Sequence, residues 1–326
     1  MRAATLALLV VCGACASDSP GSGEPDASPA TDTVSSDEQT ADGTAPEPLT
    51  YTPCSLAEGV GGFTITLAED YTGVSGQVLG GVVPKDVATV AVEAAECRLL
   101  EAPILFCDPP CVPGEACDKD GSCITYPESH SVGLVQVSGL KSPLEMDAKW
   151  GNHYTNPGTM EHPGFEEGAE LSLVAAGGDF EAFALQGVGV RAMEALASTV
   201  TVRADEELEL TWKPANDPGP TRIRIEMNIN NHGANTAWIS CDVEDTGSFA
   251  VSAELVSELF EKGVSGFPSI DLTRRSADSV TIGAGCVEFI VASTTGLSVD
   301  VEGVKSCTND GQCPQGESCG VDLQCK

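Results

Sequence analysis

The chain has 326 residues, of which 49 are acidic and 16 basic, and its formal net charge is −33 at pH 7. From Tyr51 onward, 41 acidic residues still outnumber 15 basic ones. This negative field repels polyanions and so argues against nucleic acids and anionic membrane surfaces as partners. A solvated acidic surface is the ordinary interpretation of such a charge, and diffuse binding of divalent cations is the functional alternative.

Residues 1–14 are predicted to form an export signal. The apolar run Ala3–Val11 follows Arg2 and is too short to span a bilayer, but it has the length of a signal-peptide core. Two small residues then precede Cys15. This order resembles the lipobox of bacterial lipoproteins, and the resemblance implies that Cys15 receives the lipid that anchors the protein. Cys12 stands where that family usually has an aliphatic residue, and an ordinary signal peptide cleaved nearby is the alternative.

Residues 15–50 are predicted to form a disordered acidic tether. The segment is rich in Ser, Thr, Pro, Asp and Glu and cannot bury enough apolar surface to fold. A flexible chain of this length reaches roughly 30–35 Å, enough to hold a folded body clear of a membrane. Ala16 and Ser17 resemble an outer-membrane sorting signal. We therefore expect an outer-membrane lipoprotein of the cell envelope, either surface-exposed or periplasmic.

From Tyr51 the chain changes to short runs in which apolar and polar residues alternate. The run Arg222–Ile229 is the clearest, because every second side chain is apolar, as a strand with one solvent-exposed face requires. Many such runs separated by turn residues predict an all-β fold. Because the region is large for one sandwich, we expect two β-sandwich-like domains, at 51–150 and 151–303, with the break in the Gly- and Pro-rich stretch 151–168.

One short helix is predicted, over Ala253–Lys262. Ser252 can cap its N-terminus, and Gly263 can end it in a left-handed conformation. An apolar stripe along the helix predicts that it packs on an end of the second domain.

The cysteines predict a disulfide framework. If Cys12 leaves with the signal and Cys15 is acylated, twelve of the 14 cysteines remain, an even number that suits an oxidising compartment. Four are candidates for pairs outside the cysteine-rich modules: Cys54, Cys97, Cys241 and Cys286. Cys241 and Cys286 both lie in or beside strands of the second domain, so we expect a bridge between them. The loop of about 45 residues that it closes would be worth roughly 4 kcal/mol.

The other eight cysteines form an internal repeat. The segment CVPGEACDKDGSC at 111–123 matches CPQGESCGVDLQC at 313–325 without a gap. The module cysteines are Cys107, Cys111, Cys117 and Cys123 in the first copy, and Cys307, Cys313, Cys319 and Cys325 in the second. The first module is an insert at 107–126, and the second occupies 304–326. Three disulfide connectivities are open within each module.

The repeat resembles Dickkopf N-terminal-like repeats and the short cysteine-rich repeats of uncharacterised bacterial surface lipoproteins. The resemblance implies a disulfide-stapled knob with no enzymatic activity attached. Zinc binding is the alternative, although gaps of five residues differ from the shorter knuckles of zinc ribbons. A separate segment, Tyr71–Val78, resembles the opening of transthyretin-like accessory domains, which are non-catalytic β-sandwiches.

Candidate catalytic and metal-binding residues are few. The sequence contains no nucleophile elbow, HExxH, Walker, EF-hand or Rossmann motif. Ser138 and Lys141 have the spacing of Ser-Lys acyl-enzymes but lack a partner motif. His153, Glu161 and His162 offer metal ligands within one loop, although adjacent residues rarely both face one ion.

Two polar segments complete the candidates. Residues 230–235, around His232, are typical of a hairpin turn, with sugar binding as the functional alternative. Asp205–Glu209 can attract calcium, with a solvated strand end as the plainer interpretation.

The sequence therefore predicts a lipid-anchored, non-catalytic envelope protein with a structural, adhesive or protein-binding role. We expect no enzyme activity, cofactor or metal site, a membrane contact through the lipid anchor, a protein or glycan partner, and no nucleic acid. The first alternative is a carbohydrate-binding surface module that uses Trp150, Trp212 or Trp238. The second is a metal-dependent hydrolase.

Overall fold

The computed structural model describes residues 49–230 and 236–326. The predicted signal peptide, Cys15, nearly all of the acidic tether and His232 lie outside these residues. All of the described residues belong to one compact unit that extends from Glu47 to Lys326.

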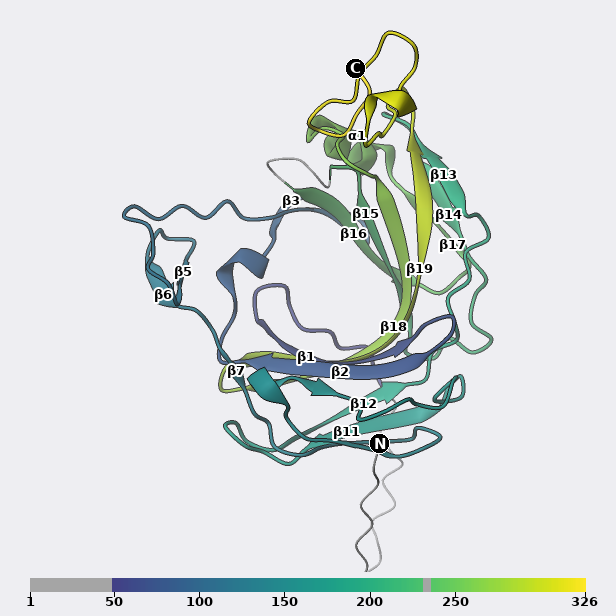
Figure 1. Cartoon of the computed structure of the whole chain (residues 1–326). Coiled ribbons are helices and arrows are strands. Elements are labelled where there is room, and N and C mark those ends of the chain that lie inside the picture. Colours follow the sequence, from purple (N-terminus) through teal and green to yellow (C-terminus); the bar gives the residue numbers. More distant parts are fainter. Residues whose placement is uncertain (1–48, 231–235) are drawn as a thin grey trace, which may run out of the picture. The chain divides into compact units, whose positions relative to one another are not determined.

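Strands dominate the described residues, which confirms the predicted all-β class. The largest sheet there has eleven strands (Figure 1). In sheet order it runs β10 (Tyr154–Thr155), β2 (Thr72–Leu79), β1 (Gly59–Leu67), β19 (Gly285–Val301), β18 (Ser269–Ile282), β15 (Arg222–Asn228), β16 (Ala237–Glu244), β4 (Cys97–Glu101) and β3 (Thr89–Ala94), with β13 (Thr199–Val202) paired to β19 and β7 (Ser129–His130) paired to β2.

The two long strands β18 and β19 form a hairpin in the middle of this sheet, and the hairpin bends along its length (Figure 1). The first part of β19 pairs in parallel with β1, and its last part pairs in parallel with β13. On the other edge, the first part of β18 pairs with β15. Strands from both predicted β domains thus join one sheet, so the stretch 151–168 does not divide the strands into two sheets.

Two hydrophobic cores lie along the hairpin. The first is closed by a four-stranded sheet of β12 (Phe183–Val188), β11 (Glu170–Ala175), β8 (Val135–Ser138) and β9 (Leu144–Met146). The second is closed by the two-stranded sheet of β14 (Leu208–Thr211) and β17 (Ser248–Val251), together with α1 (Ala253–Glu261). The partition differs from the predicted domains, because Leu99 contributes to the second core and Phe289 to the first.

The helix α1 confirms the sequence prediction. The Ser252 hydroxyl accepts a hydrogen bond from the backbone N–H of Leu255 at 3.4 Å, and Gly263 has the expected positive φ. The buried face of the helix, with Leu255 and Leu259 fully inaccessible, packs into the second core. Short 3-10 turns also occur at η1 (Pro84–Asp86), η2 (Trp150–Asn152) and η3 (Asp310–Gln312). No helix within 49–230 or 236–326 is long and apolar enough to cross a membrane.

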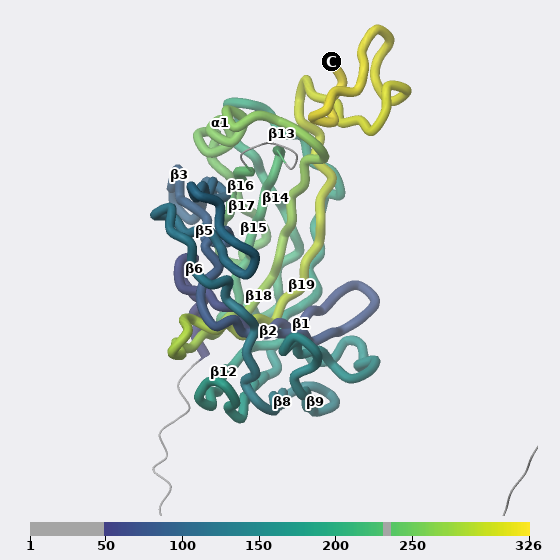
Figure 2. The backbone as a smooth tube through the Cα atoms, turned by 60° about the vertical axis from the view of Figure 1, so that its left-hand side comes forward, coloured from purple at the N-terminus to yellow at the C-terminus, as the bar shows by residue number. Residues whose placement is uncertain are grey.

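The two cysteine modules share one connectivity. In each, the first cysteine is bonded to the third and the second to the fourth: Cys107–Cys117, Cys111–Cys123, Cys307–Cys319 and Cys313–Cys325. In the first module, β5 (Glu115–Cys117) and β6 (Cys123–Thr125) form a small hairpin. The second module follows directly on β19 (Figure 2, yellow). Because all eight sulfur atoms are in disulfides, they are not available as the thiolate ligands that zinc requires.

The expected bridge between Cys241 and Cys286 is wrong. Cys241 is bonded to Cys97, and Cys286 is bonded to Cys54. The reason is strand order, since β16 lies beside β4 and places Cys241 directly opposite Cys97. Cys286 lies at the start of β19 beside β1, where the chain arrives from Cys54.

Candidate ligand-binding groove

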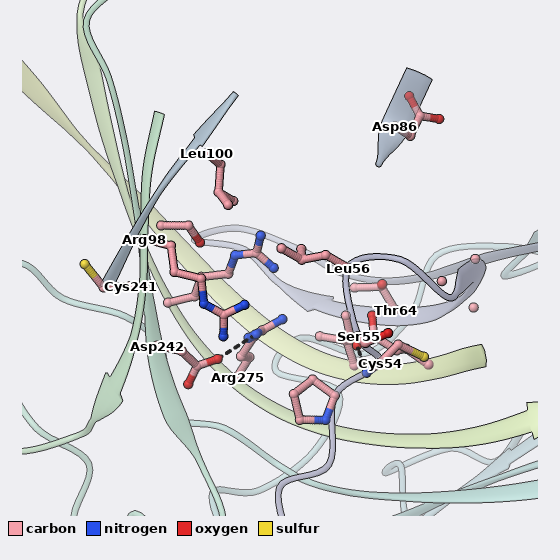
Figure 3. Close-up of a pocket in the computed structure, with 18 of the residues that line it drawn as sticks. Cys54, Ser55, Leu56, Thr64, Asp86, Arg98, Leu100, Cys241, Asp242 and Arg275 are labelled. Carbon is pink, nitrogen blue, oxygen red and sulfur yellow. Dashed lines mark hydrogen bonds and ion pairs between the residues drawn. The ribbon is translucent and has the colours of Figure 1, made fainter. Parts of the chain in front are cut away.

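A groove of about 740 Å³ lies along the large sheet, and Figure 3 shows residues that line it. Its polar side chains on β15 and β16 come from the face of the sheet that is turned away from the second core. On β15 and β16 the residues Ile225 and Cys241 are buried in the second core, so their neighbours Arg224, Ser240 and Asp242 point to the other side. The segment before β1, from Pro53 to Leu56, forms the opposite wall.

The strand register arranges the polar side chains of this face in rows. Arg224 lies opposite Asp242 on one side and Thr273 on the other. In the next row, Ser240 lies between Glu226 and Arg98. Directly opposed residues in a sheet are about 4.5–5.5 Å apart, so cationic, anionic and hydroxyl groups alternate within contact distance.

Asp242 is the centre of the charged network. It accepts hydrogen bonds from Arg275 Nη2 at 2.8 Å, from Arg222 Nε at 2.6 Å and from the Tyr51 hydroxyl. Burial alone would raise the pKa of Asp242, but the hydrogen bonds from Tyr51, Arg275 and Arg222 and the charge of Arg275 outweigh it and lower the pKa below its ordinary value. Burial and the bond to Asp242 raise the pKa of Tyr51, which stays a neutral donor. The network is therefore fixed in one charge state around neutral pH.

Arg275 forms part of the groove floor. Its side chain is only 8% exposed, and its guanidinium lies 5.5 Å from the centre of the Tyr51 ring, a cation–π distance. Its Nε has no hydrogen-bond partner among the described residues. The guanidinium is thus held in place by Tyr51 and Asp242 with one donor unused.

Two other arginines of the groove are more accessible. Arg98 pairs with Glu93 at 3.2 Å and Arg224 pairs with Glu226 at 2.7 Å, and their side chains are 49% and 30% exposed. With Arg222 and Arg275, four of the seven arginines between residues 49 and 326 belong to this one region. Each of them has an acidic partner, so the region is dense in charge but nearly balanced.

The chain that arrives from the tether is fixed to the groove. The Thr52 N–H donates to the Ala277 carbonyl at 2.9 Å, and the Cys54 N–H donates to Glu288 Oε1 at 2.7 Å. The disulfide to Cys286 then secures the same segment covalently.

The catalytic candidates from the sequence do not converge. Lys141 forms an ion pair with Glu166 at 3.0 Å rather than contacting Ser138, which pairs across strands with Ser172. The two ring nitrogens of His162 contact Thr72 Oγ1 and the Glu69 carbonyl, both at 3.1 Å. Among the described residues, every group of side chains with metal-ligand spacing contains at least two cysteines, and all of these cysteines are disulfide-bonded.

The three tryptophans have different settings. Trp212 is buried and donates from Nε1 to Asp245 at 2.7 Å, which excludes it from ligand contact. Trp150 is 96% exposed on η2 and does not line the groove. Trp238 is half-buried on the same face of β16 as Ser240 and lies opposite Leu100, a lining residue. Trp238 therefore borders one end of the groove.

The groove was not predicted from the sequence. Its members come from distant segments, with Arg98, Arg224, Asp242 and Arg275 on four different strands. The one available signal was the charged outer face of the run 222–229 in a chain with few arginines. Asp205–Glu209 lies apart from the groove, and the Asp205 carboxylate accepts a hydrogen bond from Ser257 at 2.8 Å.

Comparisons with known proteins do not assign this chain to a family. No family model matches the chain, and no curated protein matches it. A solved structure from a 1.5-MDa bacterial ice-binding adhesin, described in terms of host cell surface retention, is 10% identical in sequence. The match covers 81% of this chain and 72% of that chain, with a TM-score of 0.18. The tetra-tandem repeat in the extending region of a large adhesion protein is 12% identical, over 76% of each chain, with a TM-score of 0.18. Similarity at this level carries no argument about fold or function.

Proposed function

We propose that this chain is a non-catalytic binding protein of the cell envelope and that the groove between Arg98, Asp242 and Pro53–Leu56 holds its ligand. The observation that carries the proposal is the groove itself, whose volume of about 740 Å³ lies within the range of roughly 300–1,000 Å³ typical of ligand pockets. Its polar groups converge from separate strands and are held by one another before any ligand arrives.

The charge states of the central groups favour binding over proton transfer. A general acid or base works best when its pKa lies near the working pH. Burial opposes both shifts, but contacts with Tyr51, Arg275 and Arg222 lower the pKa of Asp242, and contacts with Tyr51 and Asp242 raise the pKa of Arg275. This pair therefore keeps its protons fixed at neutral pH and offers hydrogen bonds with a constant pattern.

The location of the protein is part of the proposal. Six disulfides between residues 54 and 325 suit an oxidising compartment. The lipobox resemblance at Cys15 supports a lipid anchor at that residue.

Protease treatment of intact cells, with mass spectrometry of the released peptides, tests the exposure of the region after Tyr51. Metabolic labelling with a fatty acid tests the anchor, and we expect the label to be lost in Cys15→Ala.

Binding is tested by filling the groove. Ser240 is half-buried on the groove face, so Ser240→Trp places a large side chain in the groove without entering a core. The probe is a suspension of envelopes from cells that make the protein, and the readout is co-sedimentation of the full chain carrying Cys15→Ala, so that the proposed lipid anchor does not contribute. We expect at least tenfold weaker binding for Ser240→Trp and no change for Thr201→Trp, an exposed residue of β13. Equal binding by both variants would show that the groove is not the site.

A further inference from the structure

We propose that the groove binds an uncharged polyhydroxyl ligand, a neutral glycan. This inference rests on the proposed binding function and adds the chemical class of the ligand. It follows from the charge balance of the groove, from the pattern of donors and acceptors on its face, and from the apolar surface at its edge.

The charge balance disfavours ions of either sign. Three arginines and four acidic residues line the groove: Arg98, Arg224, Arg275, Asp86, Glu96, Asp242 and Glu288. An anion that approached Arg275 would lie against the Asp242 carboxylate, which is held by three donors and repels a second negative charge. Displacing Asp242 instead would leave an uncompensated buried charge, which is strongly unfavourable. A cation would meet the guanidinium groups. A ligand without charge avoids both costs.

The donor and acceptor pattern matches hydroxyl groups. A guanidinium only donates hydrogen bonds and an ionised carboxylate only accepts them, whereas a hydroxyl does both. Arg224 and Asp242 are opposed on neighbouring strands, so one ligand hydroxyl can accept from the first and donate to the second. Arg98 and Ser240 are opposed one row along the strands, where the serine hydroxyl can accept or donate beside the guanidinium donor. A chain of linked sugars presents successive hydroxyls to such a row.

The edge of the groove offers apolar surface to the faces of sugar rings. Leu56 lines the groove and is 39% exposed, and Ile290 lines it from β19. Trp238 lies opposite Leu100 at one end. Pockets for small ligands combine apolar walls with a few placed polar groups, and this groove has both.

Rigidity of the polar groups favours binding of a weakly interacting ligand. Tyr51 donates a hydrogen bond to Asp242 and its ring centre lies 5.5 Å from the Arg275 guanidinium, and the Cys54–Cys286 bridge holds the wall that carries Leu56. Side chains that are already fixed lose little conformational entropy when a ligand arrives. On binding, a hydroxyl exchanges hydrogen bonds to water for hydrogen bonds to protein, and each exchange contributes little net free energy. The smaller loss of conformational entropy therefore matters most for a neutral glycan.

The experiment uses the full chain with Trp150→Phe, so that buried Trp212 and groove-edge Trp238 remain as fluorophores. The probes are neutral gluco-, manno- and xylo-oligosaccharides, with oligogalacturonate and heparin fragments as acidic probes. We expect saturable quenching by a neutral oligosaccharide that disappears in Trp238→Phe. Because no net charge is neutralised, the Kd should change less than twofold between 50 and 500 mM NaCl.

Substitutions in the groove provide the second measurement. We expect Arg224→Gln and Arg98→Gln each to weaken neutral-glycan binding at least fivefold by calorimetry. Arg203→Gln is the matched control, because Arg203 pairs with Glu206 and Glu302 on the surface away from the groove. Tighter binding of an acidic probe, with a strong dependence on salt, would overturn the assignment of a neutral ligand.

The outcomes separate the two proposals. If Ser240→Trp abolishes binding to envelopes but no neutral oligosaccharide binds the wild type, the ligand class is wrong and the binding function stands. If neither envelopes nor oligosaccharides bind the wild type, both proposals fail. If neutral oligosaccharides bind and Ser240→Trp leaves their Kd unchanged, the groove is not their site.

Discussion

Arg274 and Arg275 are consecutive residues of β18, and their side chains lie on opposite faces of the large sheet. Arg275 contributes to the groove, whereas Arg274 is fully buried on the side of the cores. Arg274 Nε and Nη2 donate to the Asp245 carboxylate at 2.7 and 3.2 Å, and Nη1 donates to the Ala192 carbonyl at 3.0 Å. Trp212 donates to the same carboxylate. This cluster joins the bend of β18 to the segments that cross between the two cores.

The cluster predicts a large loss of stability for Asp245→Asn. The substitution leaves the buried Arg274 charge without its counter-ion, and breaking such a pair costs about 3–5 kcal/mol. Urea unfolding at pH 7 measures the change. The control is Glu206→Gln, whose partner Arg203 is on the surface, and exposed pairs contribute little. Similar effects of the two substitutions would contradict the role of the cluster.

Asp245 also predicts a dependence of stability on pH. Burial would raise the pKa of Asp245, but hydrogen bonds from Arg274 and Trp212 and the charge of Arg274 outweigh burial and lower it. A carboxyl with a lowered folded-state pKa stabilises the protein above its unfolded-state pKa of about 3.9. This contribution is lost as the pH falls through the lower folded-state value. Between pH 6 and pH 2.5, the urea midpoint of the wild type should fall more steeply than that of Asp245→Asn; parallel curves would refute the assignment.

Gly61 is required by the irregular pairing of β1. Its φ is +105°, and an added Cβ would lie 2.3 Å from the Gln77 carbonyl oxygen. Gly61→Ala should therefore destabilise the protein by about 1–3 kcal/mol through backbone strain. Gly59→Ala in the same strand meets nothing within 4 Å and is the matched control. Thermal unfolding followed by circular dichroism distinguishes them, and equal Tm values would contradict the prediction.

At the scale of the elements, regular alternation was readable from the sequence and broken alternation was not. The run predicted at Arg222–Ile229 is β15, because one of its faces packs on a core throughout. The strand β18 was not predicted as a unit, since Arg274, Arg275, Ser276 and Ala277 are all buried where the sheet bends. Likewise, β19 continues through residues 294–296, where two threonines and a glycine interrupt its run of apolar residues.

The groove was beyond sequence reasoning for a related physical reason. Its walls depend on pairings between distant segments, such as the parallel contact of β1 with β19 and the antiparallel contact of β4 with β16. A hydrophobic pattern shows which face of a strand is buried but not which strand lies beside it. The wrong pairing of Cys241 with Cys286 has the same origin.

The disulfides predict unequal effects on the folded body. The Cys54–Cys286 bridge closes a separation of 232 residues, whereas Cys313–Cys325 closes 12. In the chain-entropy model the first is worth about 5 kcal/mol and the second about 3, with measured values often smaller. Cys54→Ser with Cys286→Ser should lower the main Tm in calorimetry. Cys313→Ser with Cys325→Ser should change the C-terminal module and leave that transition nearly unchanged. A larger shift from the second pair would contradict this.

At the scale of the whole molecule, two hydrophobic cores share the hairpin of β18 and β19, and their membership does not follow the predicted domain boundaries. Leu272 of β18 belongs to the second core and Ile282 of the same strand belongs to the first. The length of the region after Tyr51 indicates more than one sandwich, but the alternation of residues does not show that the same two strands serve both cores. Nothing in a local pattern marks a strand that passes from one core to the next.

The charge of the whole molecule predicts stabilisation by salt. With 41 acidic and 15 basic residues after Thr50, the folded body repels itself, and salt screens this repulsion. Raising NaCl from 10 to 200 mM at pH 7 should increase the Tm by a few degrees, whereas a matched concentration of glycerol should not reproduce the change. A fall in Tm would show that specific ion pairs outweigh the general repulsion.

The bridge between Cys54 and Cys286 determines how the molecule would carry a mechanical load. Tension applied between the segment before Leu49 and the C-terminus passes directly from Cys54 to Cys286, because the covalent path through the sulfur atoms is the shorter one. Residues 55–285 form a closed loop that this tension does not extend. The strands β4, β15, β16 and β18 of the groove all belong to that loop. A ligand could thus be held under drag while the pulling force is borne by β19 and the residues that follow it.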